Sequence, residues 1–244
     1  MARTLNVSQK GLFLTDSYIY RNARTINELN DVFDIRYKVL TEELSRIPKK
    51  YVSDIFDSIA TNFIAYRSGV PVGTVRVITD NQLREMGQTA FSGESKVDLT
   101  PYRTSGINVM EVSRLAILNQ FRRTPVIRSL CACAYHFSRI HMCNYAFIIA
   151  SCEMDRAYNP GDNIEVPRLF KNFGFEAIGP IKKPGYYDSF NCYSVPMLIQ
   201  YDMISSRHRE LYERLRAETA INYVELSGDE LQQLYLASNA MAYG

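Results

Sequence analysis

Residues 109–117, VMEVSRLAI, have the composition of a strand but include a carboxylate, Glu111, and a guanidinium, Arg114. Burying a carboxylate is unfavourable unless a cation pairs with it or it has a chemical task. One such task is general-base catalysis, in which Glu111 takes a proton from an attacking group, through a water molecule. The alternative is a structural ion pair with an arginine, and the two roles can coexist.

The geometry of a strand separates these two side chains. Strict alternation places Glu111 and Ser113 on one face and Arg114 on the opposite face. Only a β-bulge, which adds one residue to one strand of a pair, would bring Arg114 to the face of Glu111. A functional pairing of these residues therefore predicts a bulge in this strand.

Several elements precede this strand. Apolar residues at helical spacing within residues 26–44 predict an amphipathic helix. Residues 62–66 and 72–78 predict a β-hairpin, because Gly69 and Pro71 suit the turn between them. Residues 80–106 are polar, with three glycines and a proline, and predict a long irregular surface connection of the kind that often carries function.

The elements that follow predict a crossover. Thr124 can cap a helix and Pro125 suits its first position, so a helix is expected to run to about residue 143. The apolar run 145–151 predicts a strand covered on both faces. A short helix near 168–173, a strand at 191–201 and two helices beginning near residues 205 and 229 complete the expected order.

Composition narrows the class of protein. A chain of 244 residues with 46% hydrophobic content fits one large domain, and a net charge of +2 argues against nucleic-acid binding. No apolar run is long enough to span a membrane, and five scattered cysteines indicate a reducing, cytoplasmic location. The cysteines and histidines between residues 131 and 143 point in several directions on a helix, so packing is favoured over a metal site. They are Cys131, Cys133, His136, His141 and Cys143.

The charged residues together resemble the GNAT-type acyltransferases, in the branch of acyl-homoserine-lactone synthases and long-chain N-acyl amino acid synthases. That pattern has an arginine in the first helix, two aspartates three residues apart, an arginine on a strand and then E-x-S-R. The matching residues here are Arg36, Asp54 and Asp57 in SDIFD, Arg76 in GTVRV, and Glu111, Ser113 and Arg114 in EVSR. The segment LFKNFGF, residues 169–175, is similar to a helix-to-strand segment of GNAT proteins.

This resemblance implies an α/β fold, with a central mixed twisted sheet flanked by helices. The acyltransferase domain is expected at residues 25–204, after an N-terminal segment 1–24 and before a helical C-terminal extension 205–244. Glu111, Ser113 and Arg114 are expected at the catalytic centre. Arg36, Asp54, Asp57 and Arg76 are expected to form a charge cluster that is mainly architectural.

Two departures refine the expected activity. Lactone synthases have aromatic residues, notably a tryptophan, after the first arginine, whereas this chain has Leu40 and no Trp. Acetyl-CoA-using relatives have a glycine-rich turn that binds a pyrophosphate, whereas this chain has no glycine between Gly106 and Gly161. The corresponding turn suits the single phosphate of phosphopantetheine on an acyl carrier protein. Arg122, Arg123 and Thr124 are the candidate contacts, with a solvated basic turn as the alternative.

The resemblance therefore predicts transfer of a long-chain acyl group from acyl carrier protein to the amine of an amino acid, tyrosine in the best-known type. The expected partners are the carrier, the acyl group and the amino acid, with no bound cofactor or metal. A lactone synthase using S-adenosylmethionine is the alternative enzyme. A GNAT-like module that only binds a carrier or lipid is the alternative outside catalysis, because a fold does not fix a function.

Overall fold

A mixed β-sheet forms the centre of the protein. The computed structural model describes residues 18–43, 52–152, 168–178, 185–187 and 192–243. Within them the sheet has the order β6-β8-β5-β4-β3-β2-β1-β9, with β7 also paired to β8. The strands are β1 Tyr18–Asn22, β2 Thr61–Arg67, β3 Val70–Thr79, β4 Val109–Ile117, β5 Tyr145–Cys152, β6 Glu176–Ala177, β7 Gly185–Tyr187, β8 Cys192–Gln200 and β9 Ile221–Asn222. The β4/β5 and β1/β9 pairs are parallel and the other pairs are antiparallel.

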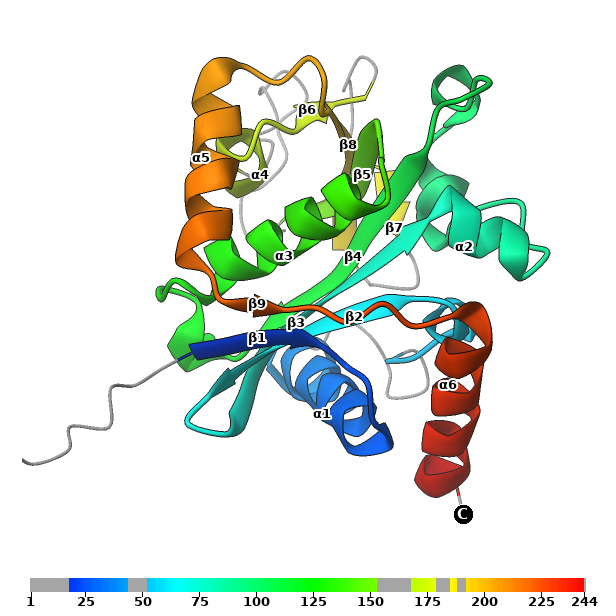
Figure 1. The fold of residues 1–244 in the computed structure, drawn as a ribbon, viewed down its shortest axis with the longest axis vertical. Helices are drawn as coiled ribbons and strands as arrows, with labels where there is room; N and C mark the ends of the chain where they lie inside the picture. Colours follow the sequence, from blue (N-terminus) through cyan, green and yellow to red (C-terminus); the bar gives the residue numbers. More distant parts are fainter. Residues whose placement is uncertain (1–17, 44–51, 153–167, 179–184, 188–191, 244) are drawn as a thin grey trace, which may run out of the picture.

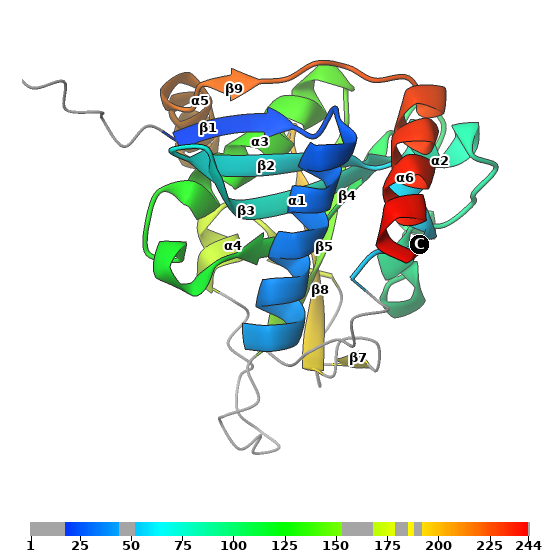
Figure 2. The ribbon, with the colours of Figure 1, turned by 90° about the horizontal axis from the view of Figure 1, so that it is seen from below.

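Helices cover both faces of this sheet (Figures 1 and 2). On one face lie α3, Val126–Ile140, and α5, Ser206–Glu218, over the largest apolar cluster. On the other face lie α1, Ile26–Arg36, and α6, Gly228–Tyr243. The short helices α2, Asp80–Glu85, and α4, Arg168–Asn172, lie at the periphery. The predicted mixed sheet flanked by helices is confirmed.

The first helix begins where its cap residues place it. Thr25 and Glu28 form a reciprocal capping box, which satisfies backbone amides at the start of α1. The α-helix ends at Arg36 and continues as a π-helix, Tyr37–Glu43, so the predicted single helix changes its hydrogen-bond pattern half-way. π-Helical turns are rare and are frequent at functional sites. Residue 44, the last of the predicted helix, lies outside the described residues.

The predicted hairpin and crossover are both present. β2 and β3 pair antiparallel. β4 and β5 are parallel and are joined by α3, which makes a helical crossover connection between them. The start of α3 differs from the prediction by one residue, because Pro125 occupies the N-cap and the helix begins at Val126. The Thr124 hydroxyl donates to the Phe121 carbonyl at 2.7 Å and accepts from the Val126 amide at 3.4 Å.

The predicted connection at residues 80–106 lies mostly at the surface, as expected, but the prediction that it is irregular is wrong. This segment contains α2 and two 3-10 helices, Ser92–Lys96 and Thr100–Tyr102. A second apolar cluster joins this segment to the sheet. It contains Leu83, Phe91 and Leu99 from the segment and Ile78, Val109 and Phe147 from the strands. The apolar residues are spaced too irregularly for a helix or strand pattern, so their burial was not visible in the sequence.

The C-terminal part of the chain contacts both faces of the sheet. After α5 on the α3 face, β9 pairs with β1 at the sheet edge, and the chain continues to α6 beside α1 (Figure 1). The hydroxyl of Ser238 in α6 donates to the Asn30 side chain at 2.5 Å. The two closing helices were predicted, whereas the short strands β1 and β9 were not.

Candidate active site

A β-bulge in β4 decides which side chains share a face. Arg76 pairs with Ser113 and Thr74 pairs with Ala116, so Arg114 and Leu115 together stand opposite one residue of β3. Arg114 has φ 53°, a left-handed conformation that non-glycine residues rarely adopt. The extra residue places Arg114 on the face of Glu111 and Ser113, as the functional pairing of these residues requires.

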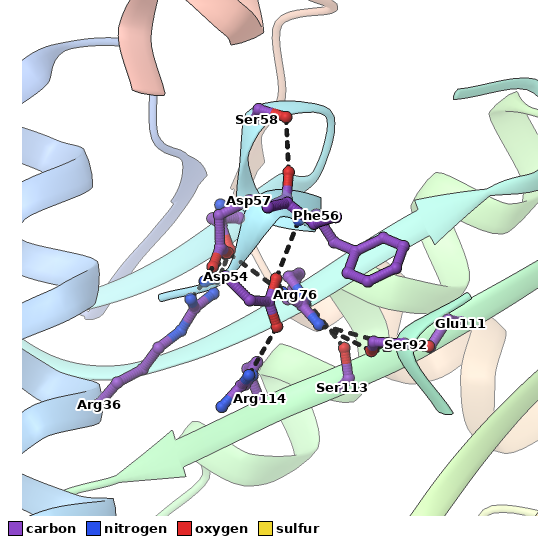
Figure 3. Close-up of polar contacts among 12 residues, drawn as sticks. Arg36, Asp54, Phe56, Asp57, Ser58, Arg76, Ser92, Glu111, Ser113 and Arg114 are labelled. Carbon is purple, nitrogen blue, oxygen red and sulfur yellow. Dashed lines mark hydrogen bonds and ion pairs between the residues drawn. The ribbon is translucent and has the colours of Figure 1, made fainter. Parts of the chain in front are cut away.

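All four residues of the predicted charge cluster come together with Arg114 (Figure 3). Arg36 pairs with Asp57 at 2.8 Å, and both side chains are fully buried. Asp54 accepts from Arg76 and from Arg114, each at 2.6 Å. The two aspartates are fixed by their own backbone, because they form a capping box at the 3-10 helix Ile55–Ser58. The three-residue spacing of Asp54 and Asp57 in SDIFD is therefore the spacing between the N-cap and N3 positions of a capping box.

Arg76 lies at the centre of this network. Its side chain is fully buried and donates to Ser113 at 3.0 Å, to Ser92 at 3.1 Å and to Glu111 at 3.4 Å, in addition to Asp54. Burial alone would lower the pKa of Arg76, but the surrounding carboxylates outweigh it and raise the pKa above its usual value. Burial lowers the pKa of Arg36 to about 10 in spite of Asp57.

Asp54 has the opposite shift. Burial would raise the pKa of this carboxyl, but the guanidinium groups of Arg76 and Arg114 hold it well below its usual range. Asp54 therefore stays ionised throughout the physiological pH range. The network contains three guanidinium groups and three carboxylates, counting Glu111, so its buried charges compensate one another.

Ser92 and Gly93 hold the carboxylate of Glu111, and sequence reasoning missed both. The Ser92 hydroxyl donates to Glu111 at 2.8 Å and the Gly93 amide donates at 2.9 Å. A side chain at position 93 would come within 3.0 Å of Ile149 and Phe147, so glycine permits the close approach. The available signal was the Ser-Gly pair beside Phe91, inside the segment that was predicted to be irregular.

A second ionic cluster fixes this segment against the sheet. Arg103 pairs with Glu94 at 2.5 Å and with Asp80 at 2.9 Å, and its guanidinium lies 4.9 Å from the centre of the Phe91 ring. Asp80 in turn accepts from the amide of Val109, the first residue of β4, at 2.9 Å. The same arginine thus ties the Ser92–Lys96 helix to the start of the strand that carries Glu111.

A cavity opens where β4 and β5 separate. The two strands pair only over Val109–Glu111 and Tyr145–Phe147, although both continue further. Beyond this point the edge of β4 that faces β5 borders a cavity of about 270 Å³. Its polar lining, on the α1 face of the sheet, includes Arg76, Ser92, Glu111, Ser113 and Arg114. Most of its apolar lining lies on the α3 face, and Leu40 and Ile149 line it on the α1 face. The α3-face lining includes Cys131, Ala134, Tyr135, Ile148, Ala150, Phe170, Phe175, Tyr201 and Tyr212.

Comparison with known proteins identifies the family of this chain. The sequence model of the N-acyl amino acid synthase FeeM family matches residues 31–200. The chain belongs to the FeeM family of N-acyl amino acid synthases. It is therefore an acyltransferase of the GNAT fold, and the resemblance found in the sequence is confirmed. A search of the curated proteins gave no sequence match.

Solved structures share the fold of this family member at low sequence identity. The FeeM synthase from uncultured soil microbes is 17% identical, with a TM-score of 0.59 over 84% of this chain and 96% of the other. The CoA-dependent acyl-homoserine lactone synthase BjaI is 16% identical, with a TM-score of 0.56 over 90% of this chain and 100% of the other. The loading GNATL domain of CurA from Lyngbya majuscula is 15% identical, with a TM-score of 0.51 over 76% of this chain and 98% of the other.

The predicted carrier-binding residues of this acyltransferase lie in the turn between the end of β4 and α3. Arg122 pairs with Glu43 of the π-helix and donates from Nε to the carbonyl of Ile117 at 3.2 Å. Arg123 is exposed at the start of α3. The amides of Phe121, Arg122 and Thr124 already donate to carbonyls within this turn.

The cysteines and histidines of α3 and of the turn after it are buried or half-buried in the acyltransferase. Burial raises the pKa of the Cys131 and Cys143 thiols to about 12, so both are protonated at neutral pH. His141 shares a hydrogen bond of 3.1 Å with the Tyr223 hydroxyl. Among the described residues, no group of three or more His, Cys, Asp or Glu side chains is arranged to hold a metal ion. The same part of the chain has no helix long and apolar enough to cross a membrane.

Proposed function

We propose that this acyltransferase moves a long-chain acyl group from acyl carrier protein to the α-amine of an amino acid, with tyrosine as the leading candidate. The observation that carries the proposal is the division of one cavity into a charged part on the α1 face and an apolar part on the α3 face. A zwitterionic amino acid suits the charged part, and an alkyl chain suits the apolar part. The thioester then lies between them, at the bulge of β4.

The proposed chemistry is aminolysis of a thioester. The amine nitrogen attacks the thioester carbonyl and gives up a proton, the resulting oxyanion collapses, and the carbon–sulfur bond breaks. The leaving thiolate takes up a proton, so the products are an amide and a free thiol. An amino acid's amine is largely protonated at neutral pH, so a base must remove a proton before or during the attack. Glu111 is the proposed base, through a water molecule, because its carboxylate lies in the cavity wall.

Ser113 is the proposed donor to the oxyanion. Its oxygen accepts from Nε of Arg76 at 3.0 Å, and a guanidinium can only donate. The hydroxyl proton of Ser113 is therefore directed elsewhere, and the side chain borders the cavity. Backbone amides on the edge of β4 beyond Glu111 are additional proposed donors. Arg114 is proposed to act with them by holding the bulge in place through its ion pair with Asp54.

The turn before α3 supports an acyl carrier protein as donor. A pyrophosphate is usually bound by free backbone amides in a glycine-rich turn. Here three amides of the turn and the Thr124 hydroxyl are used internally, so the turn suits one phosphate held by the side chain of Arg123. We propose that Arg122 has a smaller part in docking than Arg123, because it already pairs with Glu43.

The direct test is a product assay. The protein is incubated with long-chain acyl-acyl carrier protein, the common amino acids and S-adenosylmethionine, and acylated products are identified by mass. An N-acyl amino acid is the expected result, and omission of each amino acid in turn identifies the acceptor. An acyl-homoserine lactone as main product would favour the second candidate, for which the fold similarity to BjaI is the supporting observation. Binding of the carrier without any product would favour the non-catalytic module.

A donor comparison follows from the turn geometry. We expect a higher kcat/KM for acyl-acyl carrier protein than for the matching acyl-CoA, because the turn before α3 offers little to the second phosphate of CoA. Steady-state kinetics with both donors, at equal acyl-chain length, measures the ratio. Equal kcat/KM values would contradict the carrier preference.

A cytoplasmic location, where free carriers and reduced cysteines coexist, stays a prediction.

A further inference from the structure

Three tyrosines from three separate elements close the apolar part of the cavity. Tyr135 belongs to α3, Tyr201 follows β8, and Tyr212 belongs to α5. The Tyr135 and Tyr212 rings stack with centroids 4.4 Å apart, and Tyr135 meets Tyr201 edge to face at 5.6 Å. All three side chains are buried, with exposed fractions of 2% to 5%. Together they form one continuous aromatic wall, here called the tyrosine wall.

Hydrogen bonds hold the wall in place. The Tyr212 hydroxyl donates to the carbonyl of Phe173 at 2.9 Å, and the Tyr135 hydroxyl donates to Glu213 at 3.0 Å. The backbone amide of Tyr201 donates to the carbonyl of Asn144 at 2.9 Å. A buried ring anchored at its hydroxyl cannot swing aside without leaving a polar group unpaired, which is unfavourable. The wall is therefore rigid compared with the aliphatic lining.

We propose that the tyrosine wall, and Tyr212 in particular, sets the longest acyl chain that the enzyme accepts. The inference rests on the proposed function, since it assumes that the apolar part of the cavity binds the acyl chain. Tyr212 lies on α5, so a residue outside the predicted domain 25–204 determines the acyl specificity of that domain. Besides Tyr135, α3 contributes two small side chains to the cavity lining, Cys131 and Ala134, one helical turn apart.

This arrangement predicts two changes of opposite sign. Tyr212→Ala removes a ring from the wall and lengthens the space, so the preferred chain becomes longer. Each further methylene that enters the space should improve binding roughly fourfold, the effect of burying one CH₂ group. Ala134→Leu adds three carbons to the cavity lining, so the preferred chain becomes shorter.

The experiment measures chain-length profiles in two ways. A series of acyl-acyl carrier proteins of stepped chain length gives kcat/KM, and a matching series of free saturated fatty acids gives dissociation constants by calorimetry. Tyr212→Phe keeps the ring and loses the hydrogen bond to Phe173, so any shift of its profile should be smaller than that of Tyr212→Ala. Tyr223→Ala is the control, because Tyr223 is a half-buried tyrosine partner of His141 that does not line the cavity.

The two readouts separate the possible failures. Longer preferred chains for Tyr212→Ala support the tyrosine wall, and an unchanged profile in this folded variant would overturn it. If Tyr212→Ala does not fold, Ala134→Leu decides: shorter preferred chains support the wall, and an unchanged profile overturns it. If the parent protein binds fatty acids but forms no acyl amino acid, the proposed function fails while the fatty-acid profiles still test the wall. If the parent binds no fatty acid at all, the wall has no acyl ligand and the inference fails.

Discussion

At the scale of single residues, Glu111 combines the properties of a structural anion and a reactive group. Its carboxylate accepts from Ser92, Gly93 and Arg76, and it also lies in the cavity wall. Three donors explain how a strand carries a buried carboxylate. A purely structural ion pair would not need Glu111 to lie in the cavity wall, so its position there favours a chemical role.

Replacement of Glu111 by glutamine separates these roles. Glutamine keeps the shape and loses the base, so turnover should fall by roughly 10²–10⁴, the usual contribution of a positioned general base. Folding should survive, because Arg76 retains Asp54 and Asp57 as partners. Raised pH should recover part of the rate, since more of the free amine arrives deprotonated. Near-normal turnover of the folded variant at neutral pH would show that the carboxylate is only structural.

Asp54 makes a prediction for acid stability. Its folded-state pKa lies below its ordinary value of 3.8 because of Arg76 and Arg114, so the ionised carboxylate stabilises the fold above that value. This stabilisation is lost as the pH falls below about 4 toward the folded-state pKa. The difference in unfolding free energy between the parent and Asp54→Asn should therefore shrink on acidification, as measured by urea denaturation. The exposed Asp202→Asn is the matched control, and an Asp54→Asn difference independent of pH would contradict the ion pairs.

At the scale of elements, the sequence predicted most of the fold but not its irregularities. The hairpin, the crossover and the closing helices follow from apolar periodicity and turn residues, which are local properties. The bulge at Arg114 was predicted only because strict alternation would have placed Glu111 and Arg114 on opposite faces of the strand. The roles of Ser92 and Arg103 could not be predicted, because they depend on contacts between residues distant in the chain, such as Arg103 with Asp80.

The turn before α3 yields a prediction about carrier docking. Arg123→Ala removes an exposed charge at a helix start, so affinity for the acidic carrier should fall by up to roughly fivefold, the range of an exposed ion pair. Raised salt should weaken binding of the parent in the same direction. Arg214→Ala, the same charge change on an exposed part of α5, should bind normally in a calorimetric titration. Equal affinities for the parent and Arg123→Ala would return this turn to the solvated-surface interpretation.

At the scale of the whole molecule, the last forty residues support the two parts of the cavity separately. α5 contributes Tyr212 to the apolar part, whereas α6 packs on α1 and on the 3-10 helix Ile55–Ser58, which carry Arg36 and Asp57. The sheet separates α6 from α5, so a substitution that weakens the packing of α6 is expected to affect the charged part of the cavity more than the apolar part. A substitution in α6 can therefore test whether the two parts are independent.

Leu231→Ala is the appropriate change, because Leu231 is a buried residue of α6, with an exposed fraction of 6%. The lost packing should lower the free energy of unfolding by roughly 2–5 kcal/mol. Loosening of the support for Arg36 and Asp57 should raise KM for the amino acid, while the chain-length profile for fatty acids stays unchanged because α5 is intact. Leu236→Ala, with an exposed fraction of 59% on the same helix, should alter neither quantity by more than a small amount. A change in the fatty-acid profile with an unchanged KM for the amino acid would show that α6 acts on the acyl side instead, and that the two closing helices do not divide their support between the two faces of the sheet.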